Sequence, residues 1–204
     1  LIDFKNQHPK QPLTIDIYDE ATLLGNGFPY QEDDSKLVMN SYAKDLSIEA
    51  DNPNDLLDWL SYHHKEYCNP GAFIPRAMYG DYLKDRMKHY LDNDHVHIHY
   101  QRIQDIQVVD QTGDHITGNQ EKNYYYQLQT ADGYWQNTIY NVVFLNIGHP
   151  PYADHYHLMG HSGYIHDPYP VMEKLAAIHP SKKIGIIGSG LTGLDVMRYL
   201  QYHY

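Results

Sequence analysis

The stretch "KKIGIIGSGLTGLDVMRYL", residues 182–200, constrains the fold more than any other part of the chain. Residues 184–187 form an apolar run typical of a strand buried on both faces, and residues 191–200 repeat apolar side chains at helical spacing. Three glycines spaced as G-x-G-x-x-G lie between them: Gly188, Gly190 and Gly193. In a strand–turn–helix unit such glycines allow a tight turn, close approach of the backbone to a pyrophosphate, and close packing of helix on strand. The stretch therefore predicts a dinucleotide-binding turn, with a glycine-rich connection that binds nothing as the alternative.

The acidic residue that usually accompanies such a turn is found near the other end of the chain. It normally follows the glycines by roughly 20 residues, at the end of the next strand, and binds the ribose hydroxyls. The segment "PLTIDIYDE" predicts a strand over residues 13–18 that ends in Asp19 and Glu20, without a glycine turn before it. We therefore expect a chain truncated at both ends, which enters after one dinucleotide fingerprint and leaves after another.

The remaining elements are predicted from periodicity and turn signals. Apolar spacing predicts helices over residues 53–67, 79–92 and 171–178. Alternating patterns separated by turn residues predict a β-rich region with strands over residues 95–100, 103–111, 123–130 and 137–148. Residues 140–146 are nearly continuous in apolar side chains, so we expect this strand in the centre of a sheet.

Charge and cysteine content exclude several classes of partner. The net charge is −11, with 15 Lys and Arg against 26 Asp and Glu, which argues against nucleic acid or an anionic membrane as a partner. The single cysteine, Cys68, fits a reducing, cytoplasmic location, and no apolar run has membrane-spanning length. We therefore expect a small-molecule substrate, while the sequence does not specify an oligomeric state.

Histidine is abundant, with 15 residues, so a metal site has to be weighed. His95, His97 and His99 share one face of a strand at a spacing that can chelate a metal. The preferred interpretation is the solvent face of a half-buried strand whose Val96 and Ile98 point inward, and no metal is predicted. Asp195 is interpreted as an acidic residue in the first turn of the last helix, where it favours the helix dipole.

Four fragments in order carry a family resemblance: "GNGFPYQEDDSKLVMN", "FIPRAMYGDYL", "NVVFLNIGHPP" and "IGIIGSGLTGLDVM". Together they resemble the bacterial FAD/NAD(P)-binding flavoproteins, relatives of the flavin-dependent monooxygenases and amino-acid N-hydroxylases. The resemblance implies an α/β, Rossmann-like FAD/NAD(P)-binding fold of the glutathione-reductase type with a β-meander, truncated at both ends. It implies an FAD-binding domain over residues 1–150 that lacks its first strand and glycine fingerprint. A connector over 151–180 and the start of an NAD(P)-binding domain over 181–204 would follow.

The resemblance also assigns residues to FAD. Glu20 would accept hydrogen bonds from the adenosine ribose, and the backbone at Ile103 would meet the adenine. Gly25 and Gly27 would let the loop over residues 25–30 pass beside the flavin. Side chains implied to line the isoalloxazine or lie near the cofactor are Leu37, Met39, Asn40, Arg76 and Tyr79.

Two further glycine segments are assigned in the same way. Gly148 would close the flavin domain beneath the pyrophosphate, although Asn146 and Ile147 stand where the family usually has Ala and Thr. This departure leaves the backbone role of Gly148 intact and puts a threonine hydroxyl contact in doubt. The residues implied to hold the pyrophosphate of the nicotinamide dinucleotide are Gly188, Ser189, Gly190 and Gly193.

The resemblance implies an FAD- and NAD(P)H-dependent oxidoreductase of the monooxygenase or N-hydroxylase type, in which no side chain must act as a nucleophile. Two alternatives stay open: a flavin reductase or dehydrogenase that inserts no oxygen, and a non-catalytic nucleotide-binding module. Because the first fingerprint is missing, we expect these residues alone to bind FAD poorly and to be inactive.

Overall fold

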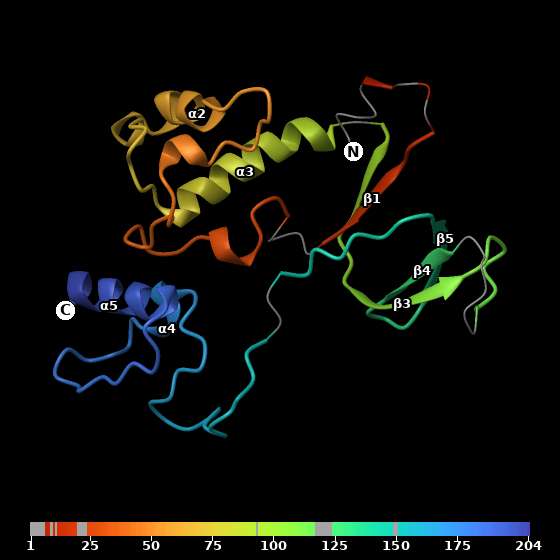
Figure 1. Ribbon diagram of the computed structural model, residues 1–204. Helices are drawn as coiled ribbons and strands as arrows, with labels where there is room; N and C mark the ends of the chain where they lie inside the picture. The colour runs from red at the N-terminus through yellow and green to blue at the C-terminus, as the bar shows by residue number, and fades with distance from the viewer. Residues whose placement is uncertain are drawn as a thin grey trace. The chain divides into compact units, whose positions relative to one another are not determined.

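The computed structural model describes residues 7–8, 10, 12–19, 24–92, 94–116, 124–148 and 151–204 (Figure 1). Contacts divide the chain into two units, each built from two separate stretches of sequence. Unit 1 combines Leu1–Leu24 with Lys88–Gly148, and unit 2 combines Gly25–Met87 with His149–Tyr204. The three-part division at residues 150 and 180 remains a prediction, since these units are drawn from contacts alone.

The described residues of unit 1 form two small sheets. Strand β1 (Ile15–Tyr18) pairs in parallel with β2 (Val96–His99), with Ile15 opposite Val96. The second sheet is antiparallel in the order β3-β4-β5, formed by Ile103–Val109, Tyr125–Thr130 and Trp135–Tyr140. The predicted strands at these places and the predicted β-meander are thereby confirmed.

The last strand of the meander is shorter than its sequence predicts, and the expected central strand over residues 140–146 is wrong. Strand β5 ends at Tyr140, which pairs with Tyr126, the second residue of β4. Beyond Tyr140, only Tyr125 of β4 remains, so the register leaves β5 at most one further partner on that strand. Four of the apolar side chains that follow are exposed, namely Val142, Phe144, Leu145 and Ile147, with Phe144 at 67%. An apolar run thus indicates a buried strand only where the fold supplies partners along its edges.

A network of polar side chains in unit 1 joins the two sheets. The Tyr140 hydroxyl on β5 donates to Asp16 Oδ2 on β1 at 2.8 Å and lies 2.9 Å from the Tyr18 hydroxyl. His99 Nε2 lies 3.1 Å from Asp16 Oδ1, and its ring stacks on Tyr18. Burial raises the pKa of Tyr140, and the hydrogen bonds with Tyr18 and Asp16 raise it further. Two of the 21 tyrosines of this chain, Tyr18 and Tyr140, thus find hydroxyl partners within the protein.

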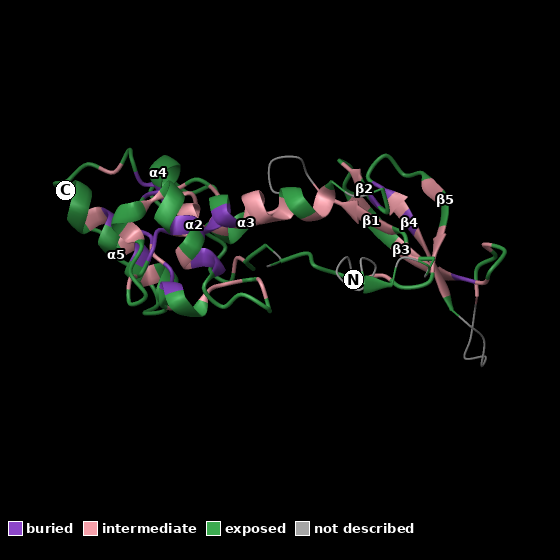
Figure 2. Cartoon of the chain, turned by 90° about the horizontal axis from the view of Figure 1, so that it is seen from above, coloured by how far each residue is buried: buried purple, intermediate pink, exposed green. Residues whose placement is uncertain are grey.

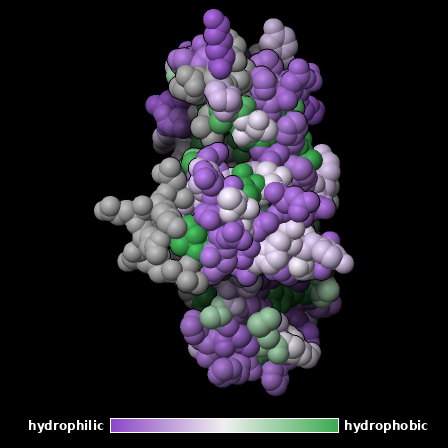
Figure 3. All heavy atoms as spheres, turned by 90° about the vertical axis from the view of Figure 1, so that its right-hand side faces the viewer, coloured by the Kyte–Doolittle hydropathy of each residue, from purple (hydrophilic) through white to green (hydrophobic). Residues whose placement is uncertain are grey.

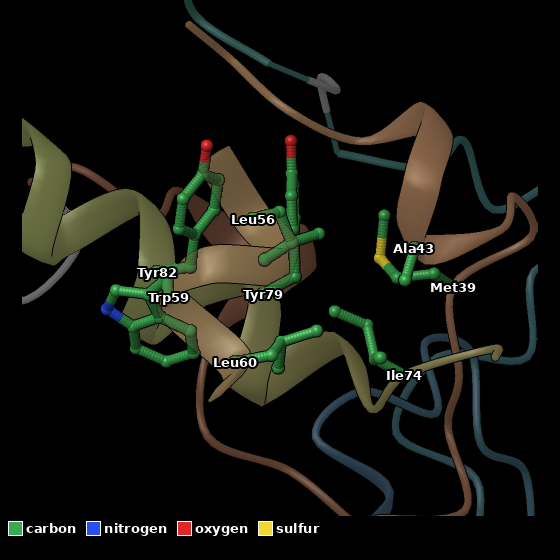
Figure 4. Close-up of a cluster of buried hydrophobic side chains, with 8 residues drawn as sticks. All are labelled: Met39, Ala43, Leu56, Trp59, Leu60, Ile74, Tyr79 and Tyr82. Atoms are coloured by element: carbon green, nitrogen blue, oxygen red, sulfur yellow. The ribbon is translucent and has the colours of Figure 1, made fainter. Parts of the chain in front are cut away.

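Unit 2 contains the larger hydrophobic cluster, which forms around two helices (Figures 2 and 4). Helix α2 (Asp55–His63) begins after Asn54, and α3 (Arg76–Leu91) begins directly after Pro75, three residues before its predicted start. The two predicted helices are confirmed. Their apolar faces meet in a cluster made of Met39, Ala43, Leu56, Trp59, Leu60, Ile74, Tyr79 and Tyr82. Three short 3-10 helices surround it: η1 (Phe28–Tyr30), η2 (Ala43–Asp45) and η3 (Lys65–Tyr67).

A second cluster in unit 2 packs the later of its two sequence segments onto the earlier one. Helix α4 (Val171–Lys174) is shorter than predicted, whereas α5 (Leu191–His203) covers the whole predicted helix. Val171, Leu175 and Tyr199 pack with Leu37, which is far away in sequence. This packing places α5 in unit 2.

The start of α4 is capped from a distant segment. Asp33 accepts hydrogen bonds from the backbone N–H groups of Val171 and Met172, at 2.9 and 3.1 Å. We expect Asp33→Ala to lower the free energy of unfolding by about 1 kcal/mol, because two N–H groups at a helix start lose their acceptor. Urea unfolding followed by circular dichroism measures the loss. The neighbouring exposed Glu32→Ala is the control, and an equal loss there would contradict a capping role.

The surface is largely hydrophilic on the side shown in Figure 3, and hydrophobic residues are scattered between the hydrophilic ones. Within the described residues, we find no helix with the length and apolarity needed to span a bilayer.

Candidate functional site

The apolar segment before the glycine turn does not form the predicted strand. Residues 183–189 have no strand structure, and Ile187 is 74% exposed. A parallel strand is held by hydrogen bonds to strands on its edges. No strand in the described part of the chain pairs with residues 184–187. The prediction of a buried parallel strand here is therefore wrong for this structure.

The glycine turn itself has the local geometry that its spacing predicts. Gly188 has φ +104°, a conformation that favours glycine, so the turn requires it. A Cβ at Gly193 would lie 2.8 Å from the Gly188 carbonyl oxygen, which explains the third glycine by close packing. A Cβ at Gly190 would meet nothing within 4 Å, and the neighbouring Ser189 is exposed. The turn thus leaves open space at its second glycine.

Helix α5 starts at this open space. Its N-cap is Gly190, which supplies no side-chain hydrogen bond to the helix start. The first backbone N–H groups of a helix have no partner within the helix, and the N-terminus has a partial positive charge. Uncapped N–H groups beside a glycine with free space in front of it fit a phosphate group.

A buried ion pair connects α5 to the start of α3. Arg76 Nη1 lies 2.6 Å from Asp195 Oδ2, and the Tyr169 hydroxyl donates to the same oxygen at 2.5 Å. Asp195 is only 4% exposed. Burial by itself lowers the pKa of Arg76, but contact with Tyr169 and the charge of Asp195 outweigh this and raise it. Burial raises the pKa of Tyr169, and its bond to Asp195 adds to this effect.

This pair corrects the interpretation of Asp195. The residue is the fifth of α5 and not part of its first turn, and its carboxylate is paired within the protein. Sequence reasoning missed the pair, although a signal was present. Leu191 and Tyr199 lie four residues before and after Asp195, so the carboxylate falls on an apolar stripe of the helix. Arg76, predicted near the cofactor, directs two donors at protein oxygens, since its Nε also donates to the Val38 carbonyl at 3.1 Å.

The loop over residues 25–30 packs tightly against α3. Gly25 and Gly27 have φ +92° and +65°, so both predicted loop glycines adopt conformations that favour glycine. A Cβ at Gly25 would lie 3.4 Å from Lys84 Cα, and a Cβ at Gly80 would lie 2.0 Å from the Tyr30 carbonyl oxygen. The glycines of both segments therefore permit the loop to lie on the helix.

Asn26, between these glycines, was not predicted as a site residue. It is 5% exposed, and its Nδ2 donates to the Tyr30 carbonyl oxygen at 3.2 Å. Its Oδ1 is buried and accepts no hydrogen bond from the described residues. A buried acceptor without a donor is costly. An N–H or O–H of a bound molecule would satisfy it, so the loop fits a ligand with such donors.

The other residues assigned to FAD have different environments. Leu37 and Met39 are buried in the two hydrophobic clusters, whereas Asn40 is exposed. Tyr79 is buried, its hydroxyl donates to the Leu46 carbonyl at 3.1 Å, and burial raises its pKa. Thus Tyr79 packs within unit 2 next to the helix start that holds Arg76.

The remaining assigned residues belong to unit 1. Ile103 is the first residue of β3, and Gly148 is exposed with φ +65°. Glu20, the predicted ribose ligand, lies outside the described residues. These three assignments remain predictions.

The histidine strand has the predicted half-buried character. Val96 is buried, His97 is exposed, and His99 pairs with Asp16. Across the part of the chain that the structure describes, no three His, Cys, Asp or Glu side chains are grouped so that they could hold a metal ion.

The mixed helices and strands, together with a glycine turn that opens a helix, define a nucleotide-binding α/β protein. Residues 3–150 match the FAD-NAD(P)-binding family, and the chain belongs to this family. Its cofactors are FAD and NAD(P)H, the pair used by flavin-dependent oxidoreductases. Comparisons with curated proteins and with solved structures gave no significant match. The family match includes the loop over residues 25–30 and ends before the glycine turn at 188–193.

Proposed function

We propose that this chain is part of an FAD- and NAD(P)H-dependent oxidoreductase of the monooxygenase or N-hydroxylase type. The finer fold proposed with it is Rossmann-like, of the glutathione-reductase type. The observation that carries this proposal is an open glycine turn at the N-terminus of α5, in a chain whose residues 3–150 match the FAD-NAD(P)-binding family. The substrate proposed is a small molecule with a soft nucleophilic centre, such as an amine or a sulfide.

The glycine turn would hold the pyrophosphate of the nicotinamide dinucleotide. Free N–H groups in the first turn of α5 would donate to its oxygens, and the missing side chain at Gly190 would let them approach. Ser189 is exposed between the glycines and would add a hydroxyl donor. The family match ends before this turn. The assignment of the turn to the pyrophosphate therefore rests on the spacing of its glycines and on its geometry.

The loop beside α3 would contribute to FAD binding. Gly25 and Gly27 hold the loop in conformations that favour glycine, and the buried Oδ1 of Asn26 would accept a hydrogen bond from the cofactor. FAD, when bound, supplies two-electron redox chemistry, and NAD(P)H supplies the hydride. The protein's task in this chemistry is to bind, orient and exclude water.

Because these residues alone are expected to be inactive, the test uses the natural full-length protein, which is mixed anaerobically with FAD and NADPH before oxygen is admitted. Loss of the flavin absorbance, followed by oxygen uptake that an amine or sulfide accelerates, would support a monooxygenase type. Flavin reduction without oxygen insertion would indicate a reductase or dehydrogenase. Binding of both cofactors without flavin reduction would indicate a nucleotide-binding module and would contradict the proposed activity.

The two glycines of the turn give a paired prediction. We expect Gly190→Ala to leave the free energy of unfolding within about 0.5 kcal/mol, because its Cβ would meet no atom within 4 Å. The same methyl group would occupy the space proposed for the pyrophosphate, so the dissociation constant of NADPH should rise at least about tenfold.

Gly193→Ala is the matched comparison. Its Cβ would press on the Gly188 carbonyl oxygen, so we expect a loss of about 1 to 2 kcal/mol of stability as well as of affinity. Thermal unfolding and NADPH fluorescence titration measure the two quantities. An unchanged NADPH affinity in Gly190→Ala would contradict the proposed site.

The net charge of the chain indicates which classes of partner it would not bind. The net charge of −11 supports a protein that binds neither nucleic acid nor an anionic membrane surface. A cytoplasmic location is proposed on the single cysteine, Cys68, which is free and exposed.

A further inference from the structure

We propose that Arg76 is a positioning residue that neutralises Asp195, so that the carboxylate that docks α5 does not repel the dinucleotide pyrophosphate. The inference rests on the proposed function of the glycine turn. It assigns Arg76 a role through another residue, in place of direct contact with a cofactor.

The first step is that α5 is docked by polar contacts close to its start. Asp195 Oδ2 accepts a hydrogen bond from Arg76 Nη1 at 2.6 Å and another from the Tyr169 hydroxyl at 2.5 Å. Arg76 is itself fixed, because its Nε donates to the Val38 carbonyl and its backbone N–H donates to the Leu37 carbonyl. The carboxylate therefore links the first residue of α3 with the helix that follows the glycine turn.

The second step concerns charge. Asp195 is four residues beyond the first residue of α5, which corresponds to about 6 Å along the helix axis. The N-terminus of a helix is equivalent to roughly half a positive charge, so an unpaired carboxylate at this distance would cancel its attraction for an anion. The Asp195 side chain is 6% exposed and the Arg76 side chain 20%, so solvent screens this charge only weakly.

The third step is that Arg76 supplies the compensating positive charge at contact distance. Tyr169 supplies a hydrogen bond and no charge, and it cannot replace the guanidinium. With the pair intact, the net charge of the docking contact is zero and the partial charge of the helix start remains available to phosphate. The pair thereby fixes the orientation of α5 without an electrostatic cost to the turn at its start.

Three variants of the 204-residue chain test this, with NADPH as the probe in a fluorescence titration. Arg76→Met leaves the negative charge, and the dissociation constant of NADPH should rise about tenfold at low salt. Asp195→Asn leaves the positive charge and keeps an acceptor for Tyr169, so NADPH should bind as tightly or more tightly. The double variant, neutral at both positions, should return to within about threefold of the unmodified chain.

The two single variants should differ in their effect on NADPH binding, since Arg76→Met weakens it and Asp195→Asn does not. This difference separates charge compensation from a merely structural role. If the pair only held the fold together, both single variants would weaken NADPH binding and the double variant would not recover. The defect of Arg76→Met should shrink only slightly as salt is raised, because the buried Asp195 carboxylate is screened weakly. Thermal unfolding of each variant shows which are folded, and Asp195→Asn alone decides the sign if Arg76→Met does not fold.

The outcomes distinguish this inference from the proposed function. No NADPH binding to the unmodified chain would overturn the dinucleotide site and this inference with it. NADPH binding that both single variants weaken alike, or that neither changes, would overturn the role of Arg76 and leave the dinucleotide site in place.

Discussion

Replacing Gly80 by alanine should destabilise the protein by about 3 kcal/mol or more, although alanine is ordinarily the better helix former by about 1 kcal/mol. Gly80 lies inside α3, and its added Cβ would be 2.0 Å from the Tyr30 carbonyl oxygen and 3.1 Å from the Tyr30 carbonyl carbon. Both are backbone atoms, so no side-chain rotation relieves the overlap. The loop over residues 25–30 would have to move off the helix.

Urea unfolding followed by circular dichroism measures this loss. Gly185→Ala is the matched control, because a Cβ there meets no atom within 4 Å. It should change the free energy of unfolding by less than about 0.5 kcal/mol. Stability of Gly80→Ala equal to that of the control would show that the loop does not lie on α3 as described.

Removing the charge of Arg86 should cost about 3 kcal/mol at neutral pH. Arg86 donates to both carboxylate oxygens of Asp55, at 2.7 and 3.0 Å, and links α3 to the start of α2. Asp55 is buried, and its only other described side-chain partner is the Tyr82 hydroxyl at 2.7 Å. In Arg86→Met the carboxylate keeps one neutral donor and loses its counter-charge, which leaves a buried charge uncompensated.

The loss of stability in Arg86→Met should depend on pH in a definite direction. Burial alone would raise the pKa of Asp55, but hydrogen bonds from Arg86 and Tyr82 lower it below its ordinary value of 3.8. A lowered pKa stabilises the fold above the ordinary value, and this contribution is lost as pH falls through the folded-state pKa. The deficit of Arg86→Met should therefore be largest near neutral pH and shrink towards pH 4 and below, where Asp55 in the variant takes up a proton.

The control for this prediction is an exposed ion pair. Lys174 Nζ lies 3.4 Å from Asp167 Oδ2, and both side chains are substantially exposed. Lys174→Met should change stability by no more than about 0.5 kcal/mol. A loss from Arg86→Met as small as that of the control, or one that grows in acid, would contradict a buried charge at Asp55.

Local patterns in the sequence predicted most helices and strands of this fold. Helix α2 follows from the spacing of Leu56, Leu57 and Leu60, and the meander follows from alternation broken by turn residues. The spacing of the glycines predicted a close approach at Gly193, and the structure shows this approach with the carbonyl of Gly188, five positions away, and not with a strand. These features depend on neighbours in sequence, which periodicity and spacing report directly.

What could not be predicted depends on distant partners. Arg76 and Asp195 are 119 positions apart, and no local pattern in either segment identifies the other. The apolar residues at 140–146 and 184–187 satisfy the composition of a buried strand, but a strand also needs neighbours on its edges. The unpaired oxygen of Asn26 could likewise not be predicted from the sequence, because the burial of a loop amide arises from tertiary packing.

The discontinuous make-up of unit 2 sets an order of assembly. The buried residues of the cluster around α2 and α3 all lie within residues 39–82, so their contacts are short in sequence and can form early. The cluster around Leu37 is complete only after Tyr199 has been synthesised. The hydrogen bond between Asp34 and His203 likewise joins residues 169 positions apart. At a translation rate of about 5–20 residues per second, on the order of ten seconds pass between the two events. During synthesis Leu37 therefore remains without its packing partner Tyr199 for that interval.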